Sequence, residues 1–78
     1  TGEKVGRDIY EASDRKILSR RQLEILSLIA KGVPSKQIAD KLNISIYTVN
    51  RHRQDILASL KVANTAAAVE IALRMNLI

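Results

Sequence analysis

The 78-residue sequence contains no cysteine and only one histidine, His52. The absence of cysteine excludes a disulfide framework and a thiolate zinc site, and a single histidine cannot complete a histidine-rich metal site. No nucleophile stands beside a candidate base, and no metal-ligand cluster or phosphate-binding loop is present. We therefore expect a binding domain with no catalytic residue, no metal and no cofactor.

Long apolar segments are also absent. No run approaches the roughly 20 residues that a membrane span needs, and no apolar core of a signal peptide is visible. We expect a cytoplasmic protein with no membrane partner. Because the chain opens with Thr1 rather than Met and continues with polar residues, we also expect it to be a module of a longer protein.

Positive charge is abundant. The chain carries 13 Lys and Arg against 8 Asp and Glu, which gives a formal net charge of +5 and a pI near 10. Such a balance favours a polyanionic partner, either nucleic acid or an acidic membrane face. Charge alone does not distinguish between these partners; the positions of the basic residues in the sequence are more informative.

Residues 1–17 show no sustained helical period, and we expect a linker or a loosely ordered arm there. Residues 18–78 form a single domain, which we predict to be all-α because period-2 patterning is absent and only two residues are aromatic. The four expected helices cover about 19–31, 35–42, 46–60 and 65–75. Their expected core residues are Ile25, Leu26, Ile29, Ala30, Ile38, Ala39, Leu42, Val49, Ile56, Leu60, Ala68, Val69, Ala72 and Leu73.

The second and third helices match a helix-turn-helix. Such a motif needs a small residue in its first helix, a turn residue that tolerates φ > 0, and an apolar anchor in its second helix. Ala39, Asn43 and Val49 supply these at intervals of four and six residues, and Asn tolerates the left-handed conformation. Ser45 is a suitable N-cap for the third helix. An ordinary helical hairpin is the alternative interpretation of this pattern.

The third helix has two chemically different faces. At about 100° per residue, Ile56 and Leu60 fall on the side of Val49, whereas Arg51 points away from it. Tyr47, Asn50 and Gln54 accompany Arg51 on the outward side, and His52 and Arg53 fall on the margins. Arg pairs with guanine edges, and Asn and Gln pair with adenine edges, in the major groove. We therefore predict base contacts from Tyr47, Asn50, Arg51 and Gln54; a solvated surface is the alternative.

A second set of residues is suited to the DNA backbone. Lys36 lies near the start of the second helix, where free backbone N–H groups also favour phosphate. Ser45 and Thr48 offer hydroxyls in the first turn of the third helix. The apolar stem of Arg53 can lie along the buried stripe while its guanidinium extends to a phosphate. We predict these four residues to contact the backbone, which positions a protein without specifying sequence.

These segments resemble the LuxR-type helix-turn-helix domain, also called the GerE or FixJ/NarL output domain. The resemblance rests on Leu18–Leu26, Lys31–Gly32, Ser35–Ala39, Leu42–Ser45, Thr48–Val49, His52, Ile56–Leu57, Leu60, Val62, Asn64 and Ala68–Val69. It implies a four-helix domain at the C-terminus of a bacterial transcription regulator. It also implies a third helix in the major groove of double-stranded DNA, an inverted repeat bound by two copies, and a homodimer through the fourth helix, about 65–76. RNA polymerase is a further partner that it suggests.

The resemblance also maps site residues. Family base-contacting positions match Asn50, Arg51 and Gln54, and backbone contacts match Lys36, Ser45 and Thr48. The chain departs from the family at four positions: Gln22 replaces an acidic residue, Asn50 a lysine, Arg51 a small apolar residue and Lys61 a glycine. Two of these positions lie on the outward face, so the usual target sequence of the family cannot be transferred.

Two alternatives remain open at this point. A helical protein-interaction module could present the same basic face to an acidic partner. A sigma-factor-like promoter-reading domain also uses a helix-turn-helix. The fourth helix after Asn64 and the Leu18–Leu26 pattern favour the LuxR type over the sigma-factor type.

Overall fold

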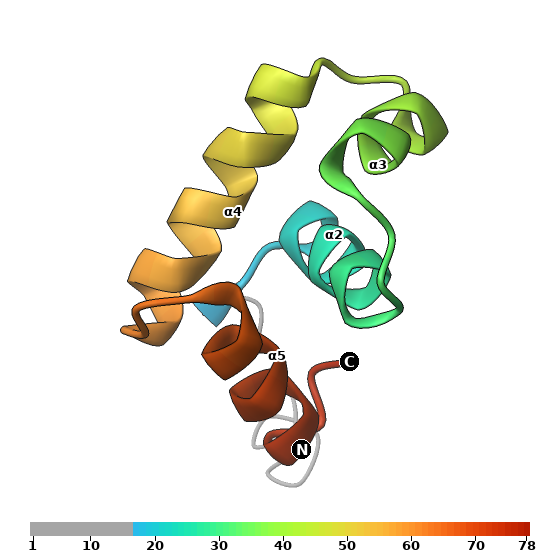
Figure 1. The fold of residues 1–78 in the computed structure, drawn as a ribbon. Coiled ribbons are helices and arrows are strands. Elements are labelled where there is room, and N and C mark those ends of the chain that lie inside the picture. The colour runs from blue at the N-terminus through green and yellow to red at the C-terminus, as the bar shows by residue number, and fades with distance from the viewer. Residues whose placement is uncertain (1–16) are drawn as a thin grey trace, which may run out of the picture.

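The computed structural model describes residues 17–78 (Figure 1). Within this range the chain forms the helices α2 (Arg20–Ala30), α3 (Ser35–Leu42), α4 (Ile46–Leu60) and α5 (Thr65–Arg74), and no strand. The all-α prediction is confirmed, and each predicted boundary is within one residue of the observed one. Apart from Ile17, the predicted arm of residues 1–17 lies outside the described residues.

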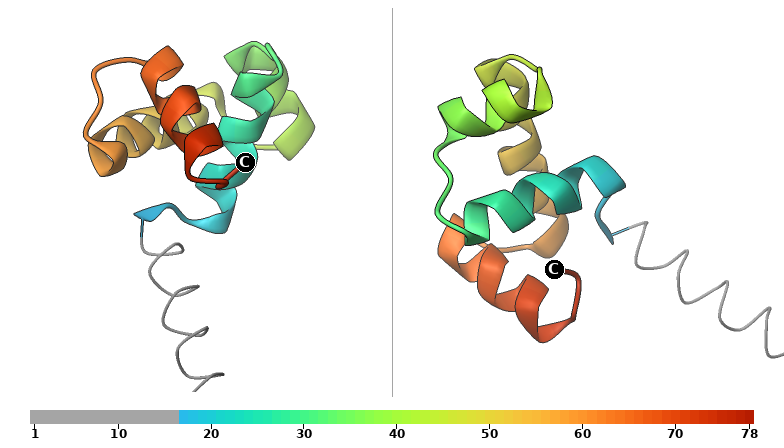
Figure 2. Two further views of the ribbon diagram at one scale, coloured as in Figure 1. Left: turned by 90° about the horizontal axis from the view of Figure 1, so that it is seen from below. Right: turned by 90° about the vertical axis from the view of Figure 1, so that its right-hand side faces the viewer.

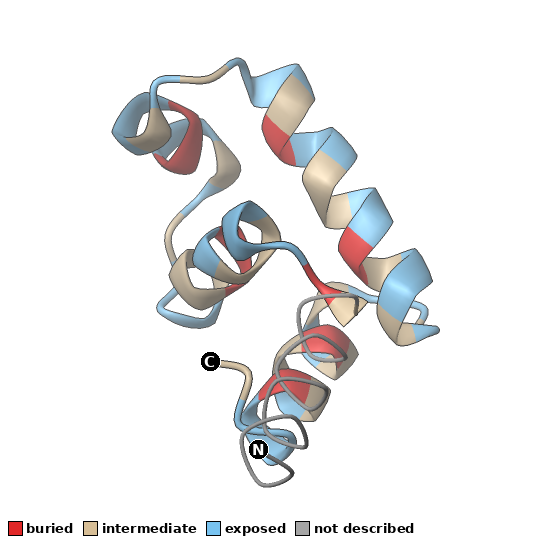
Figure 3. Ribbon diagram, turned by 180° about the vertical axis from the view of Figure 1, so that it is seen from behind, coloured by how far each residue is buried: buried red, intermediate tan, exposed pale blue. Residues whose placement is uncertain are grey.

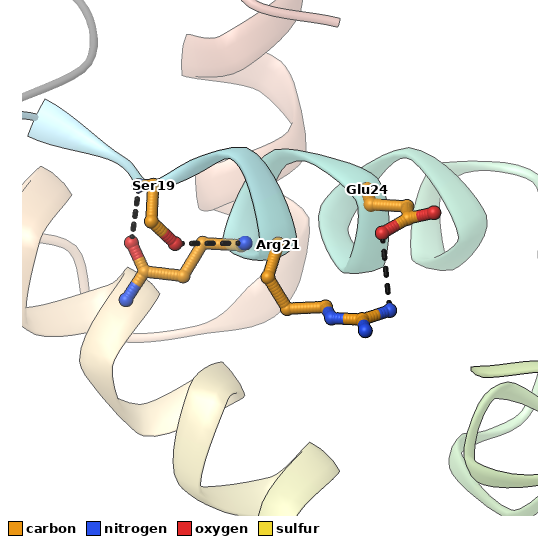
Figure 4. A network of polar contacts seen from close by, with 4 residues as sticks. Ser19, Arg21 and Glu24 are labelled. Atoms are coloured by element: carbon orange, nitrogen blue, oxygen red, sulfur yellow. Dashed lines mark hydrogen bonds and ion pairs between the residues drawn. The ribbon is translucent and has the colours of Figure 1, made fainter. Parts of the chain in front are cut away.

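A reciprocal capping box starts α2 (Figure 4). The Gln22 backbone N–H donates to Ser19 Oγ at 3.1 Å, and the Ser19 backbone N–H donates to Gln22 Oε1 at 2.8 Å. Both groups are helix-terminal donors that would otherwise lack an intrahelical partner. Gln22, which stands where the family usually has an acidic residue, therefore fulfils the capping role with its amide oxygen. Beside it, Arg21 Nη1 lies 3.2 Å from Glu24 Oε1.

The turn between α3 and α4 depends on Asn43. This residue has φ 58° and ψ 46°, the left-handed conformation that the sequence predicted. The reversal lets the Ile44 backbone N–H donate to the Ala39 carbonyl at 3.0 Å, which closes the end of α3. Ser45 is the last residue of this three-residue turn and the N-cap of α4, which begins at Ile46. The two helices and their turn form the predicted helix-turn-helix.

One apolar core joins the helices. It consists of Leu18, Ile25, Leu26, Ile38, Ala39, Val49, Ile56, Ala68 and Ala72 (Figure 3). Four further predicted core residues are half-buried against it: Ile29, Leu42, Leu60 and Val69. The prediction was wrong for Ala30 and Leu73, which are exposed. Each lies at or next to the last residue of its helix, where the neighbouring helices no longer cover the predicted stripe.

The helix α4 is the longest of those described and packs against α2, α3 and α5. In Figure 1, α2 lies beside the middle of α4, with α3 towards its N-terminal end and α5 towards its C-terminal end; Figure 2 shows the same arrangement from two further sides. All three neighbours therefore cover the same side of α4 and leave its opposite side open.

Within residues 17–78, no single helix is long and apolar enough to cross a membrane. The pair formed by α4 and α5, which is bent by 59°, meets the criteria of length and composition together.

Candidate nucleic-acid interface

The open side of α4 carries the residues that the sequence placed there. Tyr47, Asn50, Arg51 and Gln54 are all exposed, and Tyr47 retains 71% of its accessible surface. Val49 and Ile56, on the opposite side, are fully buried or nearly so. Since an α-helix has about 3.6 residues per turn, the four exposed side chains follow one another over about two turns. They form one continuous polar surface, which we call the outward face.

Burial of the apolar stripe fixes this orientation. Turning the outward face inwards would expose Val49 and Ile56 and bury the guanidinium of Arg51 without a buried counter-ion, and both changes cost free energy. His52 and Arg53 are half-buried at the margins of the stripe, as the helical projection predicts. The rotation of α4 about its axis therefore follows directly from the order of apolar and polar residues.

The N-terminus of α4 is capped by hydroxyls. Ser45 Oγ accepts a hydrogen bond from the Thr48 backbone N–H at 3.0 Å and lies 2.9 Å from Thr48 Oγ1. Within this pair only one hydroxyl hydrogen is used, so the other hydrogen is free to be donated. The backbone N–H groups of Ile46 and Tyr47 also point out of the helix end, where they favour an anion.

Arg51 is paired along its own helix. Its Nε lies 4.0 Å from Asp55 Oδ1, and the two side chains are 64% and 50% exposed. The contact was not predicted from the sequence, although the separation of four residues is one at which helical side chains meet. An ion pair this exposed is weak, so the guanidinium remains available to a ligand.

The start of α3 presents Lys36. This residue is exposed in the first turn of the helix, directly after Ser35. The N-cap residue is Pro34, which provides no side-chain hydrogen bond to the helix end. The backbone N–H groups of the first turn are therefore not occupied by a side-chain cap, and they lie next to a positive charge.

Arg53 has contacts that the sequence did not reveal. Its Nη1 donates to Ser35 Oγ at 3.1 Å, and its Nη2 donates to Thr65 Oγ1 at 3.1 Å. The partners lie 18 and 12 residues away in the chain, so no local pattern could identify them. The guanidinium thus connects α4 to the first residues of α3 and α5.

The other titratable side chains of residues 17–78 bear on two points, a possible metal site and the hydrogen bonding of His52. Among residues 17–78, no three His, Cys, Asp or Glu side chains are placed to hold a metal ion. His52 Nδ1 is buried and has no hydrogen-bond partner within the described part of the chain. The outward face and the two helix starts are rich in hydrogen-bond donors and include the cations Arg51 and Lys36, which suits binding of a polyanion.

Comparison with known proteins supports the same interpretation. The family model described as "Bacterial regulatory proteins, luxR family" matches residues 16–72. The chain is 43% identical over 74 residues to the oxygen regulatory protein NreC of Staphylococcus carnosus (strain TM300), covering 94% of this chain and 34% of that protein. It is 48% identical over 72 residues to the NreC of Staphylococcus epidermidis (strain ATCC 12228), covering 91% and 33%. The chain thus spans about a third of the length of these curated relatives.

Proposed function

We propose a mode of DNA binding for this chain, which belongs to the luxR family of bacterial regulatory proteins. In that family it is a DNA-binding output domain of a transcription regulator. Residues 18–78 bind double-stranded DNA sequence-specifically, with α4 in the major groove. Residues 1–17 join this domain to the rest of a longer regulator. The proposal depends above all on the outward face of α4, where exposed Tyr47, Asn50, Arg51 and Gln54 stand opposite the buried stripe.

Arg51 has the leading role in base recognition. A guanidinium can donate two parallel hydrogen bonds to guanine O6 and N7, and each good bidentate pair contributes about 1–3 kcal/mol of discrimination against the wrong base. Asn50 and Gln54 lie on either side of Arg51 along the helix, with side-chain amides suited to adenine N6 and N7. Tyr47, one turn earlier, contacts the base at the entry of the helix into the groove.

The phosphate contacts come from two helix starts. Lys36 and the uncapped first turn of α3 meet one phosphate, and the hydroxyls of Ser45 and Thr48 meet another at the first turn of α4. The side-chain geometry supports this division, because both helix starts carry free donors. Arg53 was predicted to belong to this group, but its guanidinium is engaged by Ser35 and Thr65.

A homodimer on an inverted repeat completes the proposed complex. Leu73 and Met75, at the C-terminal end of α5, retain 56% and 46% of their accessible surface. We propose that the segment 65–76, which carries these two exposed apolar side chains, contacts a second copy of the chain. A two-fold axis in the protein would impose a two-fold axis on the DNA site.

For the whole regulator we propose a cytoplasmic role in transcription, without enzymatic activity in this domain and with RNA polymerase as a second partner. The likeness to the NreC proteins, which are named for oxygen regulation, supports an output domain whose signal is received elsewhere in a longer chain.

Selection of binding sites from random duplex DNA tests the proposal. The expected result at low salt is an enriched motif with two inverted half-sites. A folded domain that enriches no motif would refute sequence-specific binding and would favour the protein-interaction module instead. An enriched single half-site would retain DNA binding and refute the proposed dimer.

A further inference from the structure

We infer that Arg53 is a positioning residue, which holds the DNA-reading helix α4 in register with α3 and α5 through the hydroxyls of Ser35 and Thr65. The inference rests on the proposed DNA binding and replaces a phosphate contact at Arg53 with an intramolecular one. Arg53 therefore affects base recognition through the position of α4 and not through a contact with DNA.

The hydrogen bonds of Arg53 fix α4 at two points. Nη1 and Nη2 belong to one rigid plane, and they donate at 3.1 Å to hydroxyls on two different helices. Two contacts from one plane resist both sliding of α4 and rotation about its axis. Arg53 also lies between Arg51 and Gln54 in the chain, so a change in its placement is transmitted directly to the base-reading side chains.

The surroundings of Arg53 favour these bonds. Arg53 and Thr65 lie at the junction of α2, α4 and α5, together with Leu26, Ile29, Ile56 and Leu57. Arg53 and Thr65 are both half-buried there, so their hydrogen bond is partly shielded from solvent. Hydrogen bonds of a charged donor in such a partly buried setting are stronger than those at an open surface.

The charge of Arg53 is not placed where it would stabilise the helices that it contacts. The guanidinium lies beside the first residues of α3 and α5, and helix N-termini carry partial positive charge. Within residues 17–78 no carboxylate forms an ion pair with Arg53. The two hydroxyl acceptors offset this repulsion without neutralising the charge. If Arg53 contacted a phosphate, its charge would contribute to the salt dependence of DNA binding. If it only positions α4, its charge would contribute little to that dependence.

Thr65→Val distinguishes the roles because it keeps the shape of Thr65, changes no charge and lies outside α4. Affinities for the selected site and for a random duplex should be measured over a series of salt concentrations, with Thr65→Ser as the matched control that keeps the hydroxyl. Thermal unfolding verifies that each variant is folded. Positioning predicts that Thr65→Val weakens specific binding by about threefold to tenfold, with non-specific binding and the salt dependence unchanged. Thr65→Ser, which keeps the hydroxyl, should bind the selected site about as tightly as the wild type.

Arg53→Met completes the test. Positioning predicts that Arg53→Met lowers specific affinity more than non-specific affinity, and that most of the effect of Thr65→Val disappears in the Arg53→Met background. A phosphate contact instead predicts equal weakening on all duplexes, with the slope of log affinity against log salt reduced by about 0.9, and no effect of Thr65→Val. That outcome would overturn the inference.

A measurement on the free protein separates this inference from the proposed function. Hydrogen-bonded Nη groups should give hindered rotation of the Arg53 guanidinium in NMR spectra of the wild type, and Thr65→Val should release it. A wild type that enriches no DNA motif would refute sequence-specific binding and, with it, the effect of Arg53 on DNA. A freely rotating guanidinium would refute the positioning of α4 by Arg53, whatever the DNA result.

Discussion

Arg51 and Asp55 face each other one turn apart on the exposed side of α4, with Arg51 Nε 4.0 Å from Asp55 Oδ1. Nε is the guanidinium nitrogen nearest to the carboxylate, at a distance too long for a hydrogen bond, so Nη1 and Nη2 can still donate to a ligand. An exposed pair of this kind contributes about 0–0.5 kcal/mol to stability. We propose that Asp55 restrains the side chain of Arg51, which reads the base, and leaves Nη1 and Nη2 of Arg51 available to donate.

Asp55→Asn tests this relationship. Removing a negative charge beside the DNA should tighten binding to all duplexes at low salt, by about 0.5–1 kcal/mol, and by less at high salt because the charge is screened. Discrimination at the base pair read by Arg51 should fall, because the guanidinium loses its restraint. Titration of the selected site and of a variant site at two salt concentrations measures both effects. An unchanged affinity at low salt would mean that Asp55 lies away from the DNA.

Lys36→Ala tests the phosphate contact at the start of α3. We expect the slope of log affinity against log salt to decrease by about 0.9, with specific and random duplexes weakened alike. Lys41→Ala is the matched control, because Lys41 is exposed in the last turn of the same helix. Equal slopes for the two variants would show that α3 contributes charge without a located phosphate contact.

Lys61→Gly should stabilise the domain. Lys61 ends α4 in the left-handed conformation, with φ 57°, which costs a residue with a Cβ about 1–2 kcal/mol. Glycine removes that cost but loses about 0.5–1 kcal/mol through the unfolded chain. We expect the free energy of unfolding to rise by about 0.5–1 kcal/mol and the melting temperature to rise by several degrees.

The control for Lys61→Gly is Lys31→Gly. Lys31 ends α2 at φ −85°, which does not favour glycine, so this variant should be destabilised. Calorimetry on both variants measures the difference. A loss of stability in Lys61→Gly would indicate that the lysine side chain contributes more than the backbone costs.

The sequence predicted the parts of this structure that depend on local signals. Ser19, Asn43 and Ser45 mark helix ends through their own hydrogen bonds or backbone conformation, and the helix bounds followed from them. The outward face of α4 was predictable because Val49 and Ile56 determine which side is buried. Burial at helix ends was less predictable, as exposed Leu73 shows, because it depends on how far the neighbouring helices extend.

Contacts between distant segments could not be predicted. Nothing in the order of residues indicates that Arg53 meets Ser35 and Thr65, since that contact requires the packing of three helices. The Arg51–Asp55 pair could have been recognised from its spacing, but the same spacing occurs in many exposed helices. The proposed base and phosphate contacts remain predictions, because they depend on the DNA as well as on the protein.

The most direct test of the account compares the DNA motifs selected by the wild type and by Arg51→Ala, with Arg51→Lys as a control that keeps the charge but not the planar fork. We predict that Arg51→Ala selects the wild-type motif with one base pair per half-site relaxed and with affinity reduced by about 1–3 kcal/mol. Arg51→Lys should retain non-specific affinity and relax the same position. Selection of an unchanged motif by Arg51→Ala would contradict the assignment of this face of α4 to base reading.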